Sequence, residues 1–212
     1  MLSHTCGLYL VSPIGLANGA FDAEVFAGSL AQALDSGPVE AFLLRTSGGE
    51  GRADDGLLLR QIETLLPVAR ERGVPFVLEE RADLAIKLGC DGVHLWADRK
   101  RVAAIRRALG EAPIVGAAAG ASRHAAMEAA DAGADYVTFG LFDPEPQPPD
   151  EDLLAWWQEL MEPPAVAMGG ITLENARRLA EAGADFLALR NAVWNHDEGP
   201  AAALKAFRAL LR

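Results

Sequence analysis

Residues 132–140, AGADYVTFG, hold the pattern that decides the fold: a helix end, a glycine, an aspartate and then an apolar strand. The same junction recurs as LGCDGVHL at 88–95 and as AGADFLAL at 182–189. In each case the glycine stands where a helix needs a left-handed C-terminal residue, and the small residue after it lets the chain turn back tightly. The three junctions begin 44 and 50 residues apart. This spacing predicts a repeated strand–helix unit.

Short apolar runs alternate with amphipathic stretches along the whole chain. Most of the runs are nearly continuous, which is typical of parallel strands covered on both faces. Eight strands are expected, at residues 8–12, 39–45, 74–78, 91–95, 113–117, 135–140, 164–168 and 185–189. Eight strand–helix units predict an α/β protein, a (β/α)8 TIM barrel in one domain over 1–212, with the first and last strands adjacent and parallel. A doubly wound sheet is the alternative, although no GxGxxG follows the first strand.

Composition excludes several classes of function. The 212 residues carry a formal charge of −11, and such an acidic chain repels nucleic acid and anionic membranes. Cys6 and Cys90 lack the spacing of metal ligands, so we expect reduced thiols. No apolar run reaches the roughly 20 residues of a membrane span, and no signal-peptide pattern is present. A cytoplasmic protein is expected.

The segment AMGGI at 167–171 is the clearest sign of a ligand site. It follows the seventh expected strand and precedes a helix, so the backbone N–H groups of Gly169 and Gly170 can approach an anion at a helix N-terminus. Arg190 and Asn191 follow the eighth strand, and the loops after strands seven and eight form the usual phosphate site of this fold. The alternative is that the two glycines only permit a tight turn.

Charged residues gather where three other strands end. Arg45 ends the second expected strand, where its planar fork could clamp a phosphate or diphosphate; a structural ion pair is the alternative. Glu79 and Glu80 end the third strand and Asp98 follows the fourth. Carboxylates at one rim could hold Mg²⁺, which prefers oxygen ligands. A solvated acidic edge is the alternative.

Two loops are expected on the same rim: the glycine-rich 47–56 and the proline-rich 141–150. His94, in the fourth strand, is either a hydrogen-bonded structural residue or a general base. The tryptophans are interpreted as packing residues: Trp96, Trp156, Trp157 and Trp194.

Taken in order, several segments resemble the thiamine-phosphate synthase family. They span nearly the whole chain, at 8–11, 74–85, 89–95, 133–140, 167–172 and 183–189. The resemblance implies a (β/α)8 barrel that joins an aminopyrimidine diphosphate to a thiazole phosphate and releases diphosphate with Mg²⁺. It also implies roles at the rim. These are catalysis by Arg45, Glu79 and Glu80, metal binding by Glu80 and Asp98, and binding of the substrate phosphate by Gly169, Gly170, Arg190 and Asn191.

The rim departs from the family pattern more than the scaffold does. Leu43 and Ser47 flank Arg45 where the family has glutamine and lysine, and Glu79-Glu80 replaces an Asn-Asp pair. Trp96-Ala-Asp-Arg99 replaces a Gly-Gln segment, Ala118 replaces a serine, and the proline-rich loop replaces Thr-x-Thr-Lys. Fewer cations leave less stabilisation for a departing diphosphate. We therefore expect condensation to be slow or undetectable.

Three other functions stay open at this point. A non-catalytic paralogue would bind a phosphorylated metabolite, and a different barrel enzyme would act on a phosphorylated sugar. A thiazole tautomerase-like isomerase would use a histidine after the fifth strand, where this chain has Gly120 and, a turn later, His124. The expected partner is in each case a phosphorylated small molecule. The formation of a homodimer is left open.

Overall fold

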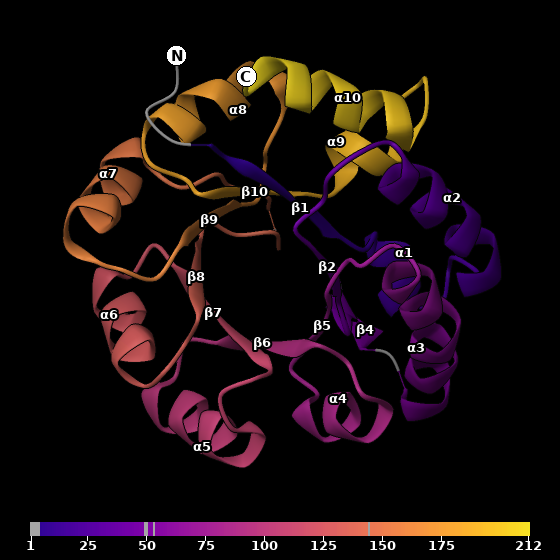
Figure 1. Cartoon of the computed structure of the whole chain (residues 1–212), viewed down its shortest axis with the longest axis horizontal. Helices are drawn as coiled ribbons and strands as arrows, with labels where there is room; N and C mark the ends of the chain where they lie inside the picture. Colours follow the sequence, from indigo (N-terminus) through magenta and orange to yellow (C-terminus); the bar gives the residue numbers. More distant parts are fainter. Residues whose placement is uncertain (1–4, 49–50, 53, 144) are drawn as a thin grey trace.

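Eight parallel strands close into a barrel in the computed structural model, which describes residues 5–48, 51–52, 54–143 and 145–212 (Figure 1). The predicted domain and rim loops include residues 1–4, 49, 50, 53 and 144, which lie outside the described residues. The barrel strands are β1 (Gly7–Val11), β2 (Ala41–Leu44), β5 (Phe76–Glu79), β6 (Gly92–Trp96), β7 (Ile114–Gly120), β8 (Tyr136–Phe139), β9 (Ala165–Met168) and β10 (Phe186–Leu189). The predicted (β/α)8 fold is confirmed.

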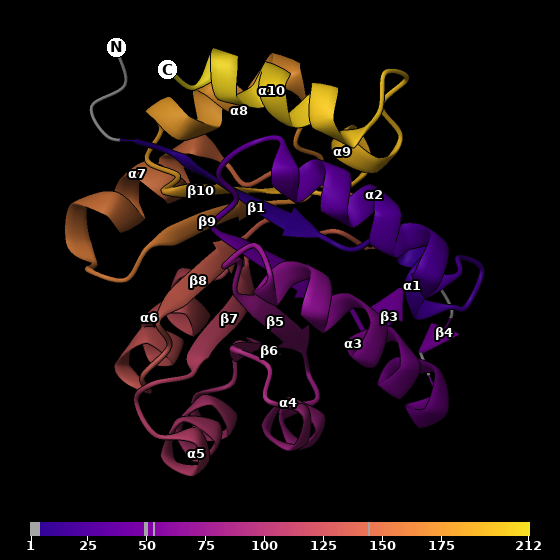
Figure 2. The ribbon, with the colours of Figure 1, turned by 45° about the vertical axis from the view of Figure 1, so that its right-hand side comes forward.

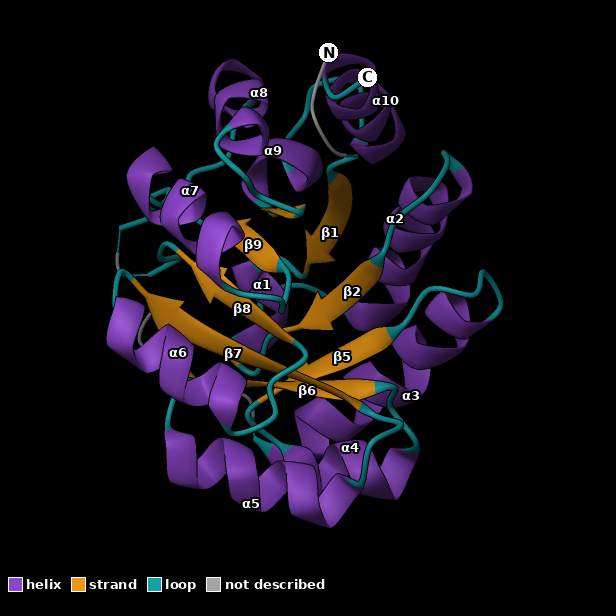
Figure 3. Ribbon diagram, turned by 60° about the vertical axis from the view of Figure 1, so that its left-hand side comes forward, coloured by secondary structure: helices purple, strands orange, loops and turns teal. Residues whose placement is uncertain are grey.

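Helices surround the barrel as an outer ring, and the strands are enclosed within it (Figures 1 and 3). They are α1 (Ile14–Ala17), α2 (Ala23–Asp35), α3 (Asp55–Arg70), α4 (Ala82–Leu88), α5 (Arg99–Leu109), α6 (Arg123–Asp131), α7 (Glu151–Leu160), α8 (Leu173–Glu181), α9 (Asn191–Trp194) and α10 (Pro200–Leu210). Among the described residues, no helix is both long and apolar enough to cross a bilayer.

The two ends of the chain close the barrel. In the register of β1 and β10, Leu8 lies beside Leu187, and β1 also pairs with β2 in parallel. The last helix, α10, contacts both α2 and α8, so the ring of helices closes at the same place (Figure 2). The predicted neighbourhood of the first and last strands is confirmed.

The repeated glycine–aspartate junction has one structural role in all three places. Each junction aspartate accepts a hydrogen bond from a backbone N–H at the start of the preceding barrel strand. Asp91 accepts from Phe76 at 2.8 Å and Asp185 from Ala165 at 2.8 Å, and Asp135 makes the equivalent bond. The side chain thus ties two neighbouring strands together at their N-terminal ends.

Apolar side chains form two cores because successive residues of a strand face opposite sides. In β1, Leu8 and Leu10 pack toward the helices, whereas Tyr9 and Val11 point into the barrel. The interior holds a small cluster of buried residues: Tyr9, Val11, Leu43, Val77, Tyr136, Phe142, Val166, Met168 and Ala188. Because these residues fill the barrel axis, the interior is a packed core and not an open channel.

The structure corrects two local expectations. Strand β7 runs on to Gly120 through an irregular pairing between Ala118 and Gly120, so Ala118 lies within the strand and not after it. The glycine-rich segment after β2 contains a short antiparallel pair, β3 (Ser47–Gly48) and β4 (Gly51–Arg52).

Candidate functional site

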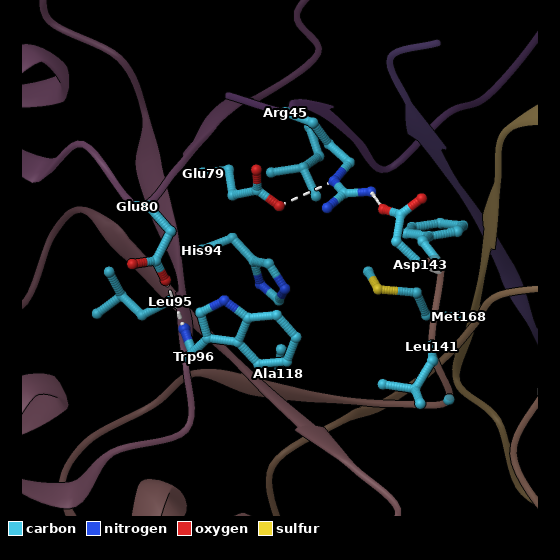
Figure 4. A pocket seen from close by; sticks show the side chains of 13 residues that line it. Arg45, Glu79, Glu80, His94, Leu95, Trp96, Ala118, Leu141, Asp143 and Met168 are labelled. Atoms are coloured by element: carbon cyan, nitrogen blue, oxygen red, sulfur yellow. Dashed lines mark hydrogen bonds and ion pairs between the residues drawn. The ribbon is translucent and has the colours of Figure 1, made fainter. Parts of the chain in front are cut away.

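A pocket opens at the C-terminal mouth of the barrel, lined by residues at or just after the ends of β2, β5, β6, β7, β8 and β9. Figure 4 shows the side chains that line it. It encloses about 490 Å³, including space open to solvent. Its walls combine charged and apolar side chains: Leu43, Arg45, Glu79, Glu80, His94, Leu95, Trp96, Ala118, Gly140, Leu141, Phe142, Asp143 and Met168. Three of the predicted site residues, Arg45, Glu79 and Glu80, therefore line one cavity.

Arg45 is buried at the pocket wall, one residue beyond the end of β2. Its backbone N–H donates to Ser12 Oγ at 3.0 Å, and its Nε donates to Glu79 Oε1 at 2.8 Å. The other oxygen of Glu79 accepts from the backbone N–H groups of Thr46 and Ser47 and from the Ser47 hydroxyl. Glu79 thus holds the chain after β2 in place, and its oxygens are occupied by protein donors.

Asp143, from the proline-rich loop, is the second carboxylate on Arg45. Its Oδ2 lies 2.5 Å from Arg45 Nη1 (Figure 4). Burial lowers the pKa of Arg45, but the charges and hydrogen bonds of Glu79 and Asp143 outweigh it and leave that pKa above its ordinary value. The guanidinium is therefore held charged in the pocket wall.

Arg190 lies close to this group at the end of β10. It is 6% exposed, and its guanidinium stacks over the Phe142 ring at 4.5 Å. Burial lowers the pKa of Arg190, and the attraction of Asp143 compensates only in part. Asn191, its predicted partner in phosphate binding, is exposed. The structure thus places Arg190, predicted to bind the substrate phosphate, near Arg45, which is predicted to be catalytic.

Glu80 and Asp98, the predicted metal ligands, both contact Arg101. Glu80 Oε2 is paired with the Arg101 guanidinium, and Glu80 Oε1 accepts from the backbone N–H of Trp96 at 2.6 Å. Asp98 is the N-cap of α5 and accepts from the Arg101 N–H at 2.8 Å. Within the described residues, no group of three His, Cys, Asp or Glu side chains is placed to hold a metal ion. Both carboxylates are thus engaged by protein donors, and we derive no step through Mg²⁺.

The proline-rich loop covers the predicted phosphate glycines. A Cβ atom on Gly169 would lie 1.9 Å from Leu141 O, and one on Gly170 would lie 2.9 Å from Pro148 Cδ. Both glycines also have positive φ, +87° and +58°. The absence of side chains here is thus required by the turn and by the loop above it, whether or not an anion binds.

His94 lies on the pocket wall and is tied to the barrel interior. Its Nδ1 is 3.1 Å from the Tyr136 hydroxyl, which in turn is 2.8 Å from the Tyr9 hydroxyl. Burial lowers the pKa of His94 to about 4, against the opposing influence of Glu79. The ring is therefore neutral near pH 7 and offers hydrogen-bonding groups without charge.

Trp96 was interpreted as a packing residue, and that interpretation is wrong. Its side chain is 58% exposed at the pocket mouth, whereas Trp157 is buried as predicted. The sequence could have indicated this, because Trp96 is the last residue of β6 and therefore lies on the rim.

The tautomerase alternative depends on His124. This side chain is 83% exposed on α6, contacts Glu128 and is not among the pocket residues.

Comparison with known proteins agrees with this scaffold. Residues 8–193 match the family described as thiamine monophosphate synthase. A thiamine-phosphate synthase of Rhodospirillum centenum is 47% identical over 212 residues, which cover 98% of each chain. The chain belongs to the thiamine monophosphate synthase family.

Other members of the thiamine monophosphate synthase family extend the agreement. A thiamine-phosphate synthase of Hyphomonas neptunium is 42% identical over 96% of this chain and 92% of its own. A solved thiamine phosphate pyrophosphorylase from Pyrococcus furiosus superposes with a TM-score of 0.78 at 25% identity, covering 97% of this chain and 95% of that one. The resemblance inferred from the sequence segments is confirmed.

Proposed function

We propose that this chain joins a thiazole phosphate to an aminopyrimidine diphosphate at the barrel mouth and releases diphosphate. The bond between the pyrimidine methylene carbon and the bridging diphosphate oxygen breaks, and its electron pair leaves with the diphosphate. The lone pair of the thiazole nitrogen forms the new carbon–nitrogen bond. Negative charge thus develops on the leaving group, and the protein's task is to stabilise it.

One observation carries the proposal: two buried arginines, Arg45 and Arg190, lie at the mouth of the barrel, and the carboxylate of Asp143 is near both. A cation in a partly desolvated site interacts with a developing oxyanion more strongly than it would in water. In the segment after the second strand, Arg45 is the residue that this chain shares with the family pattern, since Leu43 and Ser47 replace glutamine and lysine. Arg190 supplies a second cation beside it, which is why we propose turnover.

The opposite wall suits the aromatic half of the reaction. Trp96 presents an exposed indole face, and the neutral His94 ring lies beside it in the pocket (Figure 4). A flat aminopyrimidine can stack on the indole, and its polar edge can exchange hydrogen bonds with an uncharged imidazole. Such contacts would orient the methylene carbon toward the thiazole nitrogen, which lowers the entropic part of the barrier.

The test combines both substrates with the purified chain and measures thiamine phosphate and diphosphate, in Mg²⁺ and in EDTA. We expect stoichiometric formation of both products. Arg45→Ala should lower kcat about 100-fold or more, the loss typical of one transition-state donor. Arg107→Ala removes an exposed arginine of α5 and should leave kcat unchanged. Binding of thiazole phosphate without any product would refute the proposal and favour the non-catalytic paralogue.

A further inference from the structure

Asp143 sits between two arginines in the way a bound anion would. Its Oδ2 is 2.5 Å from Arg45 Nη1, and its Oδ1 is 3.7 Å from Arg190 Nη1. The ring of Phe142, the preceding residue, lies under both guanidinium groups, 5.5 Å from that of Arg45 and 4.5 Å from that of Arg190. The loop after β8 therefore delivers one negative charge and one aromatic face to the arginine pair.

The Asp143 carboxylate accepts a hydrogen bond from Arg45, but it lies too far from Arg190 to accept one. Arg190 is 6% exposed, yet its Nε and Nη1 have no hydrogen-bond partner within the described residues. Its Nη2 makes one long contact, 3.4 Å, with the Phe142 carbonyl. Buried guanidinium N–H groups without acceptors are costly. A tetrahedral oxyanion carries more acceptor oxygens than a carboxylate, so it can serve two guanidinium forks at once.

We propose that Arg45 and Arg190 form a single binding site for a phosphate or diphosphate group, and that Asp143 is an internal anion that the ligand displaces. The two arginines follow β2 and β10, which both pair with β1. The inference rests on the proposed function for the identity of the ligand, since both proposed substrates carry such a group. It replaces the separate roles expected from the sequence, catalysis for Arg45 and binding of the substrate phosphate for Arg190.

An internal competitor lowers the apparent affinity for the ligand. If the carboxylate occupies the arginine pair for all but a fraction of the time, the apparent dissociation constant rises by the inverse of that fraction. The carboxylate also keeps the arginines charge-paired when no ligand is bound. Removing its charge should therefore lower the free energy of unfolding of the ligand-free protein and strengthen anion binding. Displacement also releases the loop that carries Asp143 when the anion binds, which relief of charge repulsion alone would not do.

Calorimetric titration with inorganic diphosphate tests the proposal without turnover. We expect Asp143→Asn to bind diphosphate about tenfold more tightly than the unaltered chain, the gain from a site that the carboxylate fills nine-tenths of the time. Glu145→Gln, which removes an exposed charge from the same loop, should bind as the unaltered chain does. Adding Arg190→Gln to Asp143→Asn should abolish the gain. Unchanged or weaker binding by Asp143→Asn would overturn the inference.

A second measurement needs no substituted chain. Diphosphate should increase amide hydrogen exchange at residues 141–143 of the unaltered protein, because Asp143 loses its arginine partner; unchanged exchange would count against the inference. The two proposals fail separately. A chain that binds diphosphate in this way but forms no product refutes the condensation alone. A chain that condenses its substrates while Asp143→Asn binds diphosphate no more tightly refutes the displaced anion alone.

Discussion

Replacing Glu79 with glutamine is expected to destabilise the fold more than any exposed charge change. The carboxylate is 8% exposed and accepts from Arg45 Nε, from two backbone N–H groups and from the Ser47 hydroxyl. Glutamine keeps the size of the side chain and one accepting oxygen. It also turns an amide N–H₂ toward donors and leaves Arg45 with Asp143 as its remaining carboxylate.

The expected loss is about 3 kcal/mol of unfolding free energy, the lower part of the range for breaking a buried pair, since one acceptor survives. For a chain of this size that corresponds to a fall in Tm of roughly 6–12 °C. Urea unfolding followed by circular dichroism measures the free energy, and the m-value should stay the same. Glu159→Gln, at an exposed position of α7, is the matched control and should change the free energy by less than about 0.5 kcal/mol. A loss below about 1 kcal/mol in Glu79→Gln, comparable to an exposed ion pair, would show that this carboxylate does not anchor the chain after β2.

Three further predictions follow from the site and the barrel. Because burial lowers the pKa of His94 from 6.5 to about 4, the unfolded state binds the extra proton first, and stability should fall as pH drops from 6.5 toward 4. At pH 5 the loss is about 2 kcal/mol, and urea titrations of His94→Gln should lack this dependence. Trp96→Ala should raise KM for the aminopyrimidine diphosphate about fivefold through lost stacking while leaving the Tm unchanged; an unaltered KM would exclude stacking on the indole. Asp185→Asn should cost about 1–2 kcal/mol because its hydrogen bond to the Ala165 N–H is charge-assisted, whereas Asp197→Asn, exposed beyond α9, should cost nothing measurable.

The barrel itself could be predicted because the signals for it are local. Apolar runs, helical stripes and the glycine–aspartate junctions each depend on residues within one strand–helix unit, and eight such units close in one main way. Gly89, Gly133 and Gly183 have the positive φ that a helix end requires. Strand bounds shifted by a few residues, as with β7, because the end of a strand depends on where its neighbour stops pairing.

The sequence predicted which residues lie at the site, but not which side chains contact one another there. Arg45, Glu79 and Glu80 line the pocket as expected, since side chains at the C-terminal ends of parallel strands must meet at one rim. Their roles as catalytic groups, and the Mg²⁺ site at Glu80 and Asp98, stay predictions. The structure adds that Arg101 contacts both Glu80 and Asp98: its long side chain reaches Glu80 from α5, and its backbone N–H donates to Asp98.

The sequence by itself therefore determined the fold, the family and the rim at which the pocket opens. Only the tertiary structure decided which charges face one another. Arg45 meets Glu79 across 34 residues and Asp143 across 98, and Arg190 joins them from the end of β10. Such pairs depend on the register of a closed sheet and on how one loop folds over its mouth. These ion pairs leave no periodic pattern in the sequence, because each joins two segments whose local conformations do not depend on one another.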